Sequence, residues 1–150
     1  MGAANGQGAG FTEIDHTADV GLRVWADDLE ALFVQAARGL AALLTDAARV
    51  EPRIERAFEL RGLDLEELLV AWLGELLYAR EAEELLLVDI PELRIRRAAD
   101  GFALQARARG ERRDPARHPL GKPIKAATYH DLRIAPGADG RYVVTIIFDT

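Results

Sequence analysis

Two segments of the sequence share a pattern typical of the start of a helix, in which aspartate, leucine and glutamate precede apolar residues at helical spacing. The first segment is Asp27-Asp-Leu-Glu30 and the second is Asp64-Leu-Glu-Glu67. An aspartate can accept hydrogen bonds from the free amides of the first turn, and a glutamate three residues later completes a capping box. Apolar residues then recur on one face over residues 28–45 and over Leu65–Leu77. The sequence therefore predicts two amphipathic helices.

Segments in which apolar and polar residues alternate surround both helices. Val20–Trp25 predicts a half-buried strand, and Arg49–Arg61 predicts a strand or a pair of strands. The shorter alternating segments after the second helix are Glu84–Ile90, Leu93–Arg97, Phe102–Arg109, Ile124–Ile134 and Tyr142–Phe148. We expect the last two of these to form a hairpin. This order predicts an α+β fold in which two amphipathic helices pack on a mainly antiparallel β-sheet.

The length of the chain favours a single domain, because 150 residues are enough for one hydrophobic core and too few for two. We assign residues 11–150 to this domain. Residues 1–10 form a Gly/Ala stretch without the features of a signal peptide, and we expect a flexible N-terminal tail. Residues 110–123 contain three prolines and predict a long surface loop.

The sequence contains no cysteine, and its longest nearly apolar helical segment falls short of the roughly 20 residues that span a bilayer. A disulfide framework and a thiolate zinc site are therefore excluded. We expect a cytoplasmic protein without a membrane span.

Charge is unevenly distributed along the sequence. Residues 1–90 contain 7 basic and 18 acidic residues, whereas residues 91–135 contain 11 basic and 5 acidic residues. A basic region of this kind can contact RNA or an acidic partner. Several of its arginines alternate along predicted strands, namely Arg94, Arg96, Arg107 and Arg109. Since a solvent-exposed sheet face has the same pattern, we favour that simpler interpretation.

Three short motifs carry polar residues that a plain core pattern does not need. Asp15-His-Thr-Ala-Asp-Val-Gly21 places two acidic residues and a histidine before a strand, where turns and helix caps could equally use them. Ile124-Lys-Ala-Ala-Thr-Tyr-His130 contains Lys125, and such a lysine is commonly a solvent-exposed strand residue. The third motif, Ile146-Ile-Phe-Asp149-Thr150, ends the sequence directly after an apolar strand.

The third motif is expected to place the carboxylate of Asp149 beside the terminal carboxylate of Thr150. Two clustered carboxylates repel each other unless a proton or a cation compensates their charge. They either extend into water or bind a positive group. Hard oxygen ligands of this type suit Ca²⁺, Mg²⁺ or Mn²⁺.

The order and spacing of these motifs resemble the archease family. The resemblance covers about Phe11 to Thr150, and it includes the Leu-Glu-Ala-Leu-Phe start of the first helix and Leu68-Leu-Val-Ala-Trp-Leu-Gly-Glu-Leu-Leu-Tyr78. Several ordered motifs over nearly the whole chain are far more specific than any one of them. The sequence departs from the family pattern at Thr150, where archeases typically end in isoleucine, and in the Gly-rich stretch before Phe11.

The resemblance implies a divalent metal site, with calcium as the family's reported ion. Asp19, the second acid of its motif, would bind the metal together with Asp149 and Thr150. A ligand from the backbone or the α-carboxylate tolerates threonine at the last position. The resemblance also implies a role in activation for Lys125, and we predict the same role for His16 and His130.

The function implied by the resemblance is activation of an RtcB-type tRNA-splicing ligase. The protein would promote guanylylation and turnover of the ligase and widen its nucleotide use from GTP to others such as ATP. It would contact tRNA only indirectly, would not bind DNA or a membrane, and would not be an enzyme itself. The sequence agrees, because it has no P-loop and no Gly-x-Ser-x-Gly motif.

Two other functions are compatible with the residues. The first is a metal-dependent phosphoester hydrolase that uses Asp19, Asp149 and His16 around one ion. The second is a chaperone or RNA-binding adaptor that uses the arginine-rich loop, whose binding would depend steeply on salt.

Overall fold

The computed structural model describes residues 8–16 and 19–150 of the chain. The predicted flexible tail, residues 1–10, lies largely outside this part. The helices are α1 (Leu29–Leu44) and α2 (Leu65–Glu83), and a 3₁₀ turn, η1 (Ala47–Arg49), follows α1. The strands are β1 (Gly10–His16), β2 (Asp19–Ala26), β3 (Ile54–Gly62), β4 (Leu85–Ala98), β5 (Gly101–Arg112), β6 (Ala126–Ala127), β7 (Ala135–Pro136) and β8 (Tyr142–Asp149).

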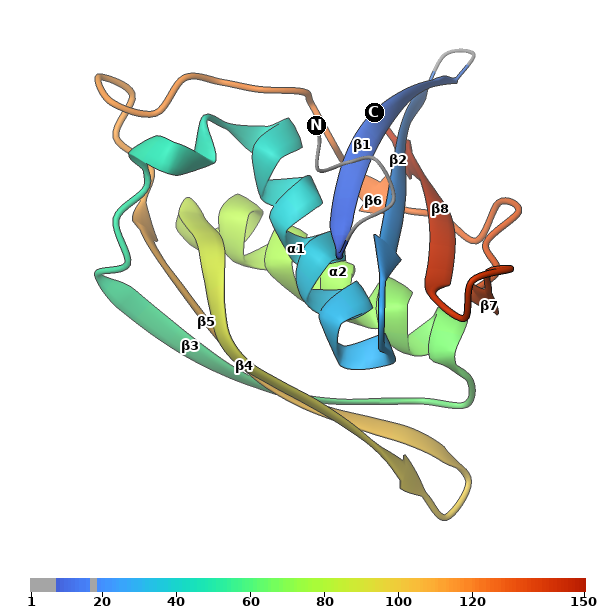
Figure 1. The fold of residues 1–150 in the computed structure, drawn as a ribbon. Coiled ribbons are helices and arrows are strands. Elements are labelled where there is room, and N and C mark those ends of the chain that lie inside the picture. The colour runs from blue at the N-terminus through green and yellow to red at the C-terminus, as the bar shows by residue number, and fades with distance from the viewer. Residues whose placement is uncertain (1–7, 17–18) are drawn as a thin grey trace.

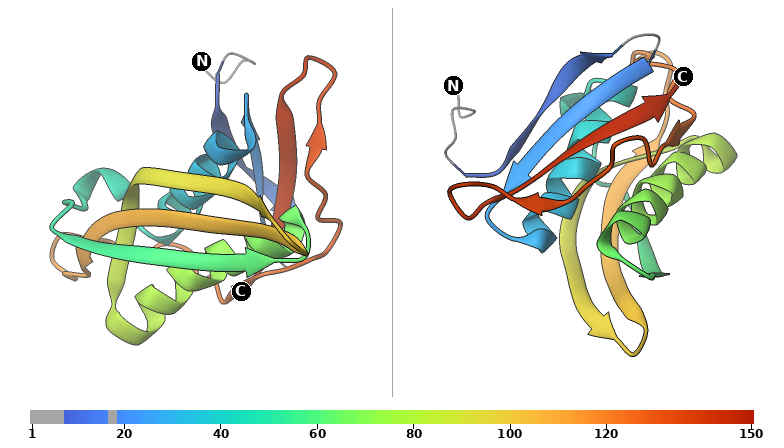
Figure 2. Two further views of the ribbon diagram at one scale, coloured as in Figure 1. Left: turned by 90° about the horizontal axis from the view of Figure 1, so that it is seen from below. Right: turned by 90° about the vertical axis from the view of Figure 1, so that its right-hand side faces the viewer.

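Two antiparallel sheets enclose the two helices (Figure 1). The first sheet has the strand order β1-β2-β8-β6, with β7 also paired to β8, and the second has the order β3-β5-β4. Helix α1 contacts β2 of the first sheet and β4 of the second, and α2 contacts β3 and β4. The right-hand view of Figure 2 looks onto the outer face of the first sheet, with the helices behind it. The predicted α+β class is confirmed, and the helices lie between two sheets.

Both helices begin where the capping patterns predict. Asp28 caps α1, because its Oδ1 accepts a hydrogen bond from the Ala31 amide at 2.7 Å. Glu30 does not close a capping box and accepts a hydrogen bond from the Ile95 amide of β4 at 2.8 Å. Asp64 caps α2 as predicted. Neither of the helices that the structure describes is long and apolar enough to cross a bilayer.

The strands depart from the sequence prediction in three places. β1 is an additional strand that pairs along its whole length with β2. The predicted segments 84–90 and 93–97 form one strand, β4, whose pairing with β5 is irregular between Leu87 and Glu92. The predicted strand 124–134 is mostly irregular, since only β6 lies within it. The expected antiparallel pairing of this segment with β8 is limited to β6, and β7 forms a short hairpin with the other end of β8.

The hydrophobic core lies between the sheets and is formed by the two helices together with the inward-facing residues of both sheets. Trp72 of α2 is fully buried, and its Nε1 donates a hydrogen bond to the Phe33 carbonyl of α1 at 3.1 Å. The polar group of this ring is therefore satisfied inside the core. Gly39 lets α1 approach the first sheet, because an added Cβ would lie 2.5 Å from Cδ2 of Leu22.

Three arginines of the basic region form ion pairs with glutamates on the second sheet. Arg109 Nε lies 2.9 Å from Glu55 Oε1, and Arg94 and Arg107 lie 3.2 and 3.4 Å from the carboxylate of Glu92. These side chains are well exposed, so each pair adds little to stability. The pairs support the interpretation of the alternating arginines as an ordinary solvent-exposed sheet face.

Candidate functional site

One edge of the first sheet, where β1 and β8 end and β2 begins, brings predicted site residues into a single row. In the β1–β2 ladder, His16 is the partner of Asp19. The β2–β8 ladder reaches Val20 and Phe148, so Asp19 and Asp149 are the next residues along these two strands. Opposed residues in antiparallel strands have Cβ atoms about 4.5–5.5 Å apart. The register therefore brings two acidic residues from opposite ends of the sequence within reach of one small ligand.

The segment that contains Lys125 is attached to the same edge. The Lys125 amide donates a hydrogen bond to the Asp149 carbonyl at 2.8 Å. The amide and the hydroxyl of Thr128 both donate to the Ile147 carbonyl, at 2.9 and 2.8 Å. These bonds to β8 hold Lys125, whose side chain is exposed, next to the row of Asp19 and Asp149.

His130 follows this attachment on the same segment. Its amide donates to Thr128 Oγ1 at 3.3 Å, and its Nε2 lies 3.3 Å from Asp131 Oδ2. Asp131 adopts a left-handed conformation, with a φ of 51°, which turns the chain directly after His130. His130 therefore lies on the same segment as Lys125, five residues further along the chain.

The donor chemistry at this edge fits a hard divalent cation. Asp149 and Thr150 are exposed and Asp19 is half-buried, so solvent has access to their oxygen atoms. Two carboxylates and an oxygen of Thr150 would leave the other positions of a Ca²⁺ ion, which takes six to eight oxygen ligands, to water. Within residues 8–15 and 19–150, no three His, Asp or Glu side chains form a group that could hold a metal ion. An ion at this edge would thus depend on water and main-chain oxygen.

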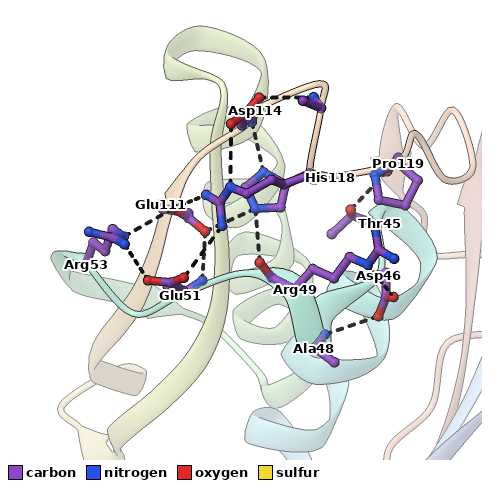
Figure 3. Close-up of polar contacts among 12 residues, drawn as sticks. Thr45, Asp46, Ala48, Arg49, Glu51, Arg53, Glu111, Asp114, His118 and Pro119 are labelled. Carbon is purple, nitrogen blue, oxygen red and sulfur yellow. Dashed lines mark hydrogen bonds and ion pairs between the residues drawn. The ribbon is translucent and has the colours of Figure 1, made fainter.

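A second polar group surrounds His118, which the sequence analysis assigned to a surface loop (Figure 3). The His118 side chain is 0% exposed. Its Nδ1 accepts a hydrogen bond from the Asp114 amide at 2.8 Å, so the ring hydrogen lies on Nε2. Nε2 lies 3.0 Å from Glu111 Oε2 and 3.2 Å from the Arg49 carbonyl. The predicted surface loop over residues 110–123 is confirmed for residues 113–123, but residues 110–112 belong to β5 and the His118 side chain is buried.

Glu111 is the acidic member of this group, which we call the His118 cluster (Glu51, Glu111, Asp114, Arg117 and His118). Its Oε2 accepts a hydrogen bond from the Glu51 amide at 2.8 Å, and its Oε1 lies 2.6 Å from Arg117 Nη2. The Glu51 amide and, next, Arg117 lower the pKa of the Glu111 carboxyl to about 2, although burial opposes them. Protein groups occupy both carboxylate oxygens and both ring nitrogens. The cluster therefore holds distant segments of the chain together, and these four atoms are not available to a ligand.

Sequence reasoning missed the His118 cluster because its members are far apart along the chain. Glu51 and Glu111 are 60 positions apart, and Arg49 and His118 are 69 positions apart. The one local signal is Asp114-Pro-Ala-Arg-His118, a sequence that can start a turn. A turn signal does not reveal that the histidine at its end is buried.

Known proteins match the chain over nearly its whole length. The archease protein family matches residues 11–150. Protein archease of Methanopyrus kandleri is 42% identical over 139 residues, which cover 93% of this chain and 98% of the relative. Protein archease of Pyrococcus abyssi is 38% identical over 135 residues, which cover 90% and 94%. The solution structure of Methanobacterium thermoautotrophicum protein 1598 aligns with a TM-score of 0.80 at 32% identity and covers 94% of this chain and 99% of that one. The chain, with its motifs gathered at one sheet edge, therefore belongs to the archease family.

Proposed function

We propose that this protein is a metal-binding accessory protein that activates an RtcB-type tRNA-splicing ligase in the cytoplasm. It promotes guanylylation and turnover of the ligase and widens its nucleotide use to others such as ATP. A divalent cation, Ca²⁺ in this proposal, binds Asp19, Asp149 and an oxygen of Thr150. The observation that supports the proposal most is the strand register, which brings the first and last motifs of the sequence to one edge.

The charges at this edge suit contact with an enzyme that handles nucleotides. A bound cation would neutralise the repulsion between Asp19 and Asp149 and give the edge a fixed shape. Lys125 adds a positive charge on a flexible side chain, which suits a phosphate or an acidic side chain of the partner. His16, opposite Asp19, and His130, on the Lys125 segment, belong to the same proposed contact surface.

The test is transfer of labelled GMP from GTP to the purified ligase, with the accessory protein present at less than one equivalent. The wild-type protein is expected to accelerate guanylylation over many turnovers. Asp19→Asn removes a charged ligand and is expected to abolish the acceleration, whereas Asp27→Asn, at an exposed aspartate of the β2–α1 connection, leaves it intact. If the wild-type protein changes neither single-turnover nor multiple-turnover guanylylation, the proposal is rejected.

The hydrolase alternative is separated by assaying the protein without the ligase. A metal-dependent hydrolase would turn over a simple phosphoester such as nitrophenyl phosphate in the presence of Ca²⁺, Mg²⁺ or Mn²⁺. An accessory protein would leave these esters unchanged. Turnover that disappears in Asp19→Asn would favour the hydrolase.

A further inference from the structure

The outer face of the first sheet contains a shallow hollow at the end opposite to Asp149. Its volume is ≈ 320 Å³, and it is lined by Thr12, Arg23, Trp25, Arg141 and Val143. This volume is at the lower end of the range for small-molecule sites. Alternate residues of a strand share a face, so Arg23 and Trp25 lie on the same side of β2, whereas Leu22, Val24 and Ala26 are buried against the helices.

Trp25 forms one wall of this hollow, and Gly10 of β1 determines how its ring lies. An added Cβ at Gly10 would be 2.7 Å from Cζ2 and 3.0 Å from Cε2 of the indole, so the ring lies against the bare backbone of β1. The indole is partly exposed. Its Nε1 is buried and has no hydrogen-bond acceptor among the described residues. Glycine at this position thus allows an aromatic ring to lie against the outer face of the sheet.

Two arginines bring positive charge to the hollow in different ways. Arg141 is held in place, because its Nε lies 2.9 Å from Asp139 Oδ2 and its Nη1 donates to the Gly8 carbonyl at 2.8 Å. The Arg23 side chain is exposed and forms no ion pair with any residue in the part of the chain that the structure describes. A guanidinium without a carboxylate partner is suited to bind a phosphate through two parallel hydrogen bonds.

We propose that this hollow binds a nucleotide, either free or as a unit of a single-stranded RNA. The base stacks on the exposed part of Trp25, the phosphate binds Arg23, and Thr12 offers its hydroxyl to the ribose or the phosphate. A stacking ring next to an unpaired arginine on a sheet face is the combination that binds single-stranded nucleic acids without sequence preference. The arginine-rich loop 110–123 is a weaker candidate, because Arg117 is held by Glu111 and Arg112 by the Glu83 carbonyl.

The proposed nucleotide site is separate from the proposed metal site. Arg23 and Asp19 are on one face of β2 and four positions apart, which corresponds to about 13 Å along a strand. Nucleotide binding at Arg23 and Trp25 therefore does not need the metal. It can be measured in a chelator, and its outcome is independent of whether the protein activates a ligase.

The experiment follows tryptophan fluorescence in EDTA during titration with AMP, with adenosine and with a 5′-phosphorylated RNA of about eight nucleotides. Trp25 is partly exposed and Trp72 is 0% exposed, so quenching by a stacked base reports on Trp25. Quenching by AMP and by RNA is expected, with weaker binding of adenosine. If RNA binds more tightly than AMP, the ligand of the site is a single-stranded RNA. If both bind equally, the ligand is a free nucleotide. Absence of quenching by both at millimolar concentrations would overturn the proposal.

Arg23→Gln is the decisive variant, because the exposed Arg23 has no buried partner whose loss would unfold the protein. The variant is expected to weaken the binding of AMP about tenfold and to leave the binding of adenosine unchanged, since one guanidinium–phosphate contact is lost. Arg61→Gln is the matched control, an exposed strand arginine of the second sheet that forms no ion pair with any residue that the structure describes. If Arg61→Gln weakens binding as much as Arg23→Gln, the ligand binds by general electrostatic attraction and the assignment to this hollow is wrong.

Discussion

The His118 cluster and the edge at Asp19 and Asp149 both join acidic residues that are distant in sequence, but they do so in different surroundings. In the cluster, His118 is 0% exposed and Glu111 is 5% exposed, and protein groups satisfy every polar atom of the pair. At the edge, Asp149 is exposed and Asp19 half-buried, and the strand register brings them together. A closed network of this kind stabilises the fold, whereas carboxylates that solvent can reach can bind a ligand. Substitutions in the two regions should therefore have opposite effects on stability and on binding.

The largest effect on stability is expected for His118→Ala. The substitution leaves the Asp114 amide and the Arg49 carbonyl without their buried partner and opens a cavity, which should lower the free energy of unfolding by about 2–3 kcal/mol. Calcium affinity should not change. Urea unfolding and calorimetric Ca²⁺ titration measure the two quantities. His130→Ala, at an exposed histidine, is the control and should unfold like the wild type. If both histidine variants unfold alike, the cluster does not stabilise the fold.

At Asp149 we expect the reverse of the His118→Ala result, with a loss of calcium affinity and no loss of stability. Asp149→Asn should lower Ca²⁺ affinity about tenfold or more, because the ligand charge at the edge is reduced. The free energy of unfolding without metal should stay the same or rise, since repulsion from Asp19 is removed. Isothermal titration calorimetry of this variant beside Asp27→Asn provides the measurement. Equal affinities in the two variants would show that Asp149 is no ligand.

Lowering the pH should reduce the contribution of the His118 cluster to stability over a defined range. The pKa of Glu111 is about 2 in the folded protein, below its ordinary value of 4.5. The ionised carboxylate therefore stabilises the fold fully above pH 4.5, and this stabilisation is lost as the pH falls from 4.5 towards 2. Glu111→Gln should be less stable than the wild type at pH 7, and the difference should shrink as the pH falls through this range. A difference that does not depend on pH would contradict the role assigned to the charge of Glu111.

The smallest effect on stability is expected for Lys125→Ala, which should change the free energy of unfolding by no more than about 0.5 kcal/mol, because the side chain is exposed. In the ligase assay, however, this variant should activate poorly. Lys122→Ala is a close control, because Lys122 is three residues away and its Nζ lies 3.2 Å from Glu13 Oε2, in an ordinary surface ion pair. Full activation by Lys125→Ala would remove this lysine from the proposed contact surface.

The elements that could be predicted from the sequence are those determined by nearby residues. The caps Asp28 and Asp64 lie within a few residues of the amides that they bind, and the apolar stripes follow directly. β1 was missed because Gly10–His16 lacks a clean alternation, and pairing with β2 decides its conformation. The segment 124–134 alternates like a strand, but it pairs with β8 only at β6, and a turn over residues 129–132 with a left-handed Asp131 ends the pairing.

The candidate site also combines features set by nearby residues with features set by residues distant in the sequence. The family resemblance implied roles for Asp19, Asp149 and Lys125, and the strand register that joins their segments came from the structure. The hollow at Trp25 was not anticipated, because its depth depends on the small Gly10 that faces the indole across the strand pair. His118 could not be recognised as buried, since its enclosing partners include the carbonyl of Arg49.

The position of β8 within the first sheet has a consequence for the order of folding. β8 pairs with β2, β6 and β7, and its partner β2 lies more than a hundred positions earlier in the chain. While the protein is being synthesised, β1 and β2 can form a hairpin early, but the edge of this sheet stays open until residues 142–149 have left the ribosome. Asp19 cannot meet Asp149 before that moment. A cation that requires both carboxylates would thus bind only after β8 has paired with β2, so that metal uptake would report the closing of this sheet.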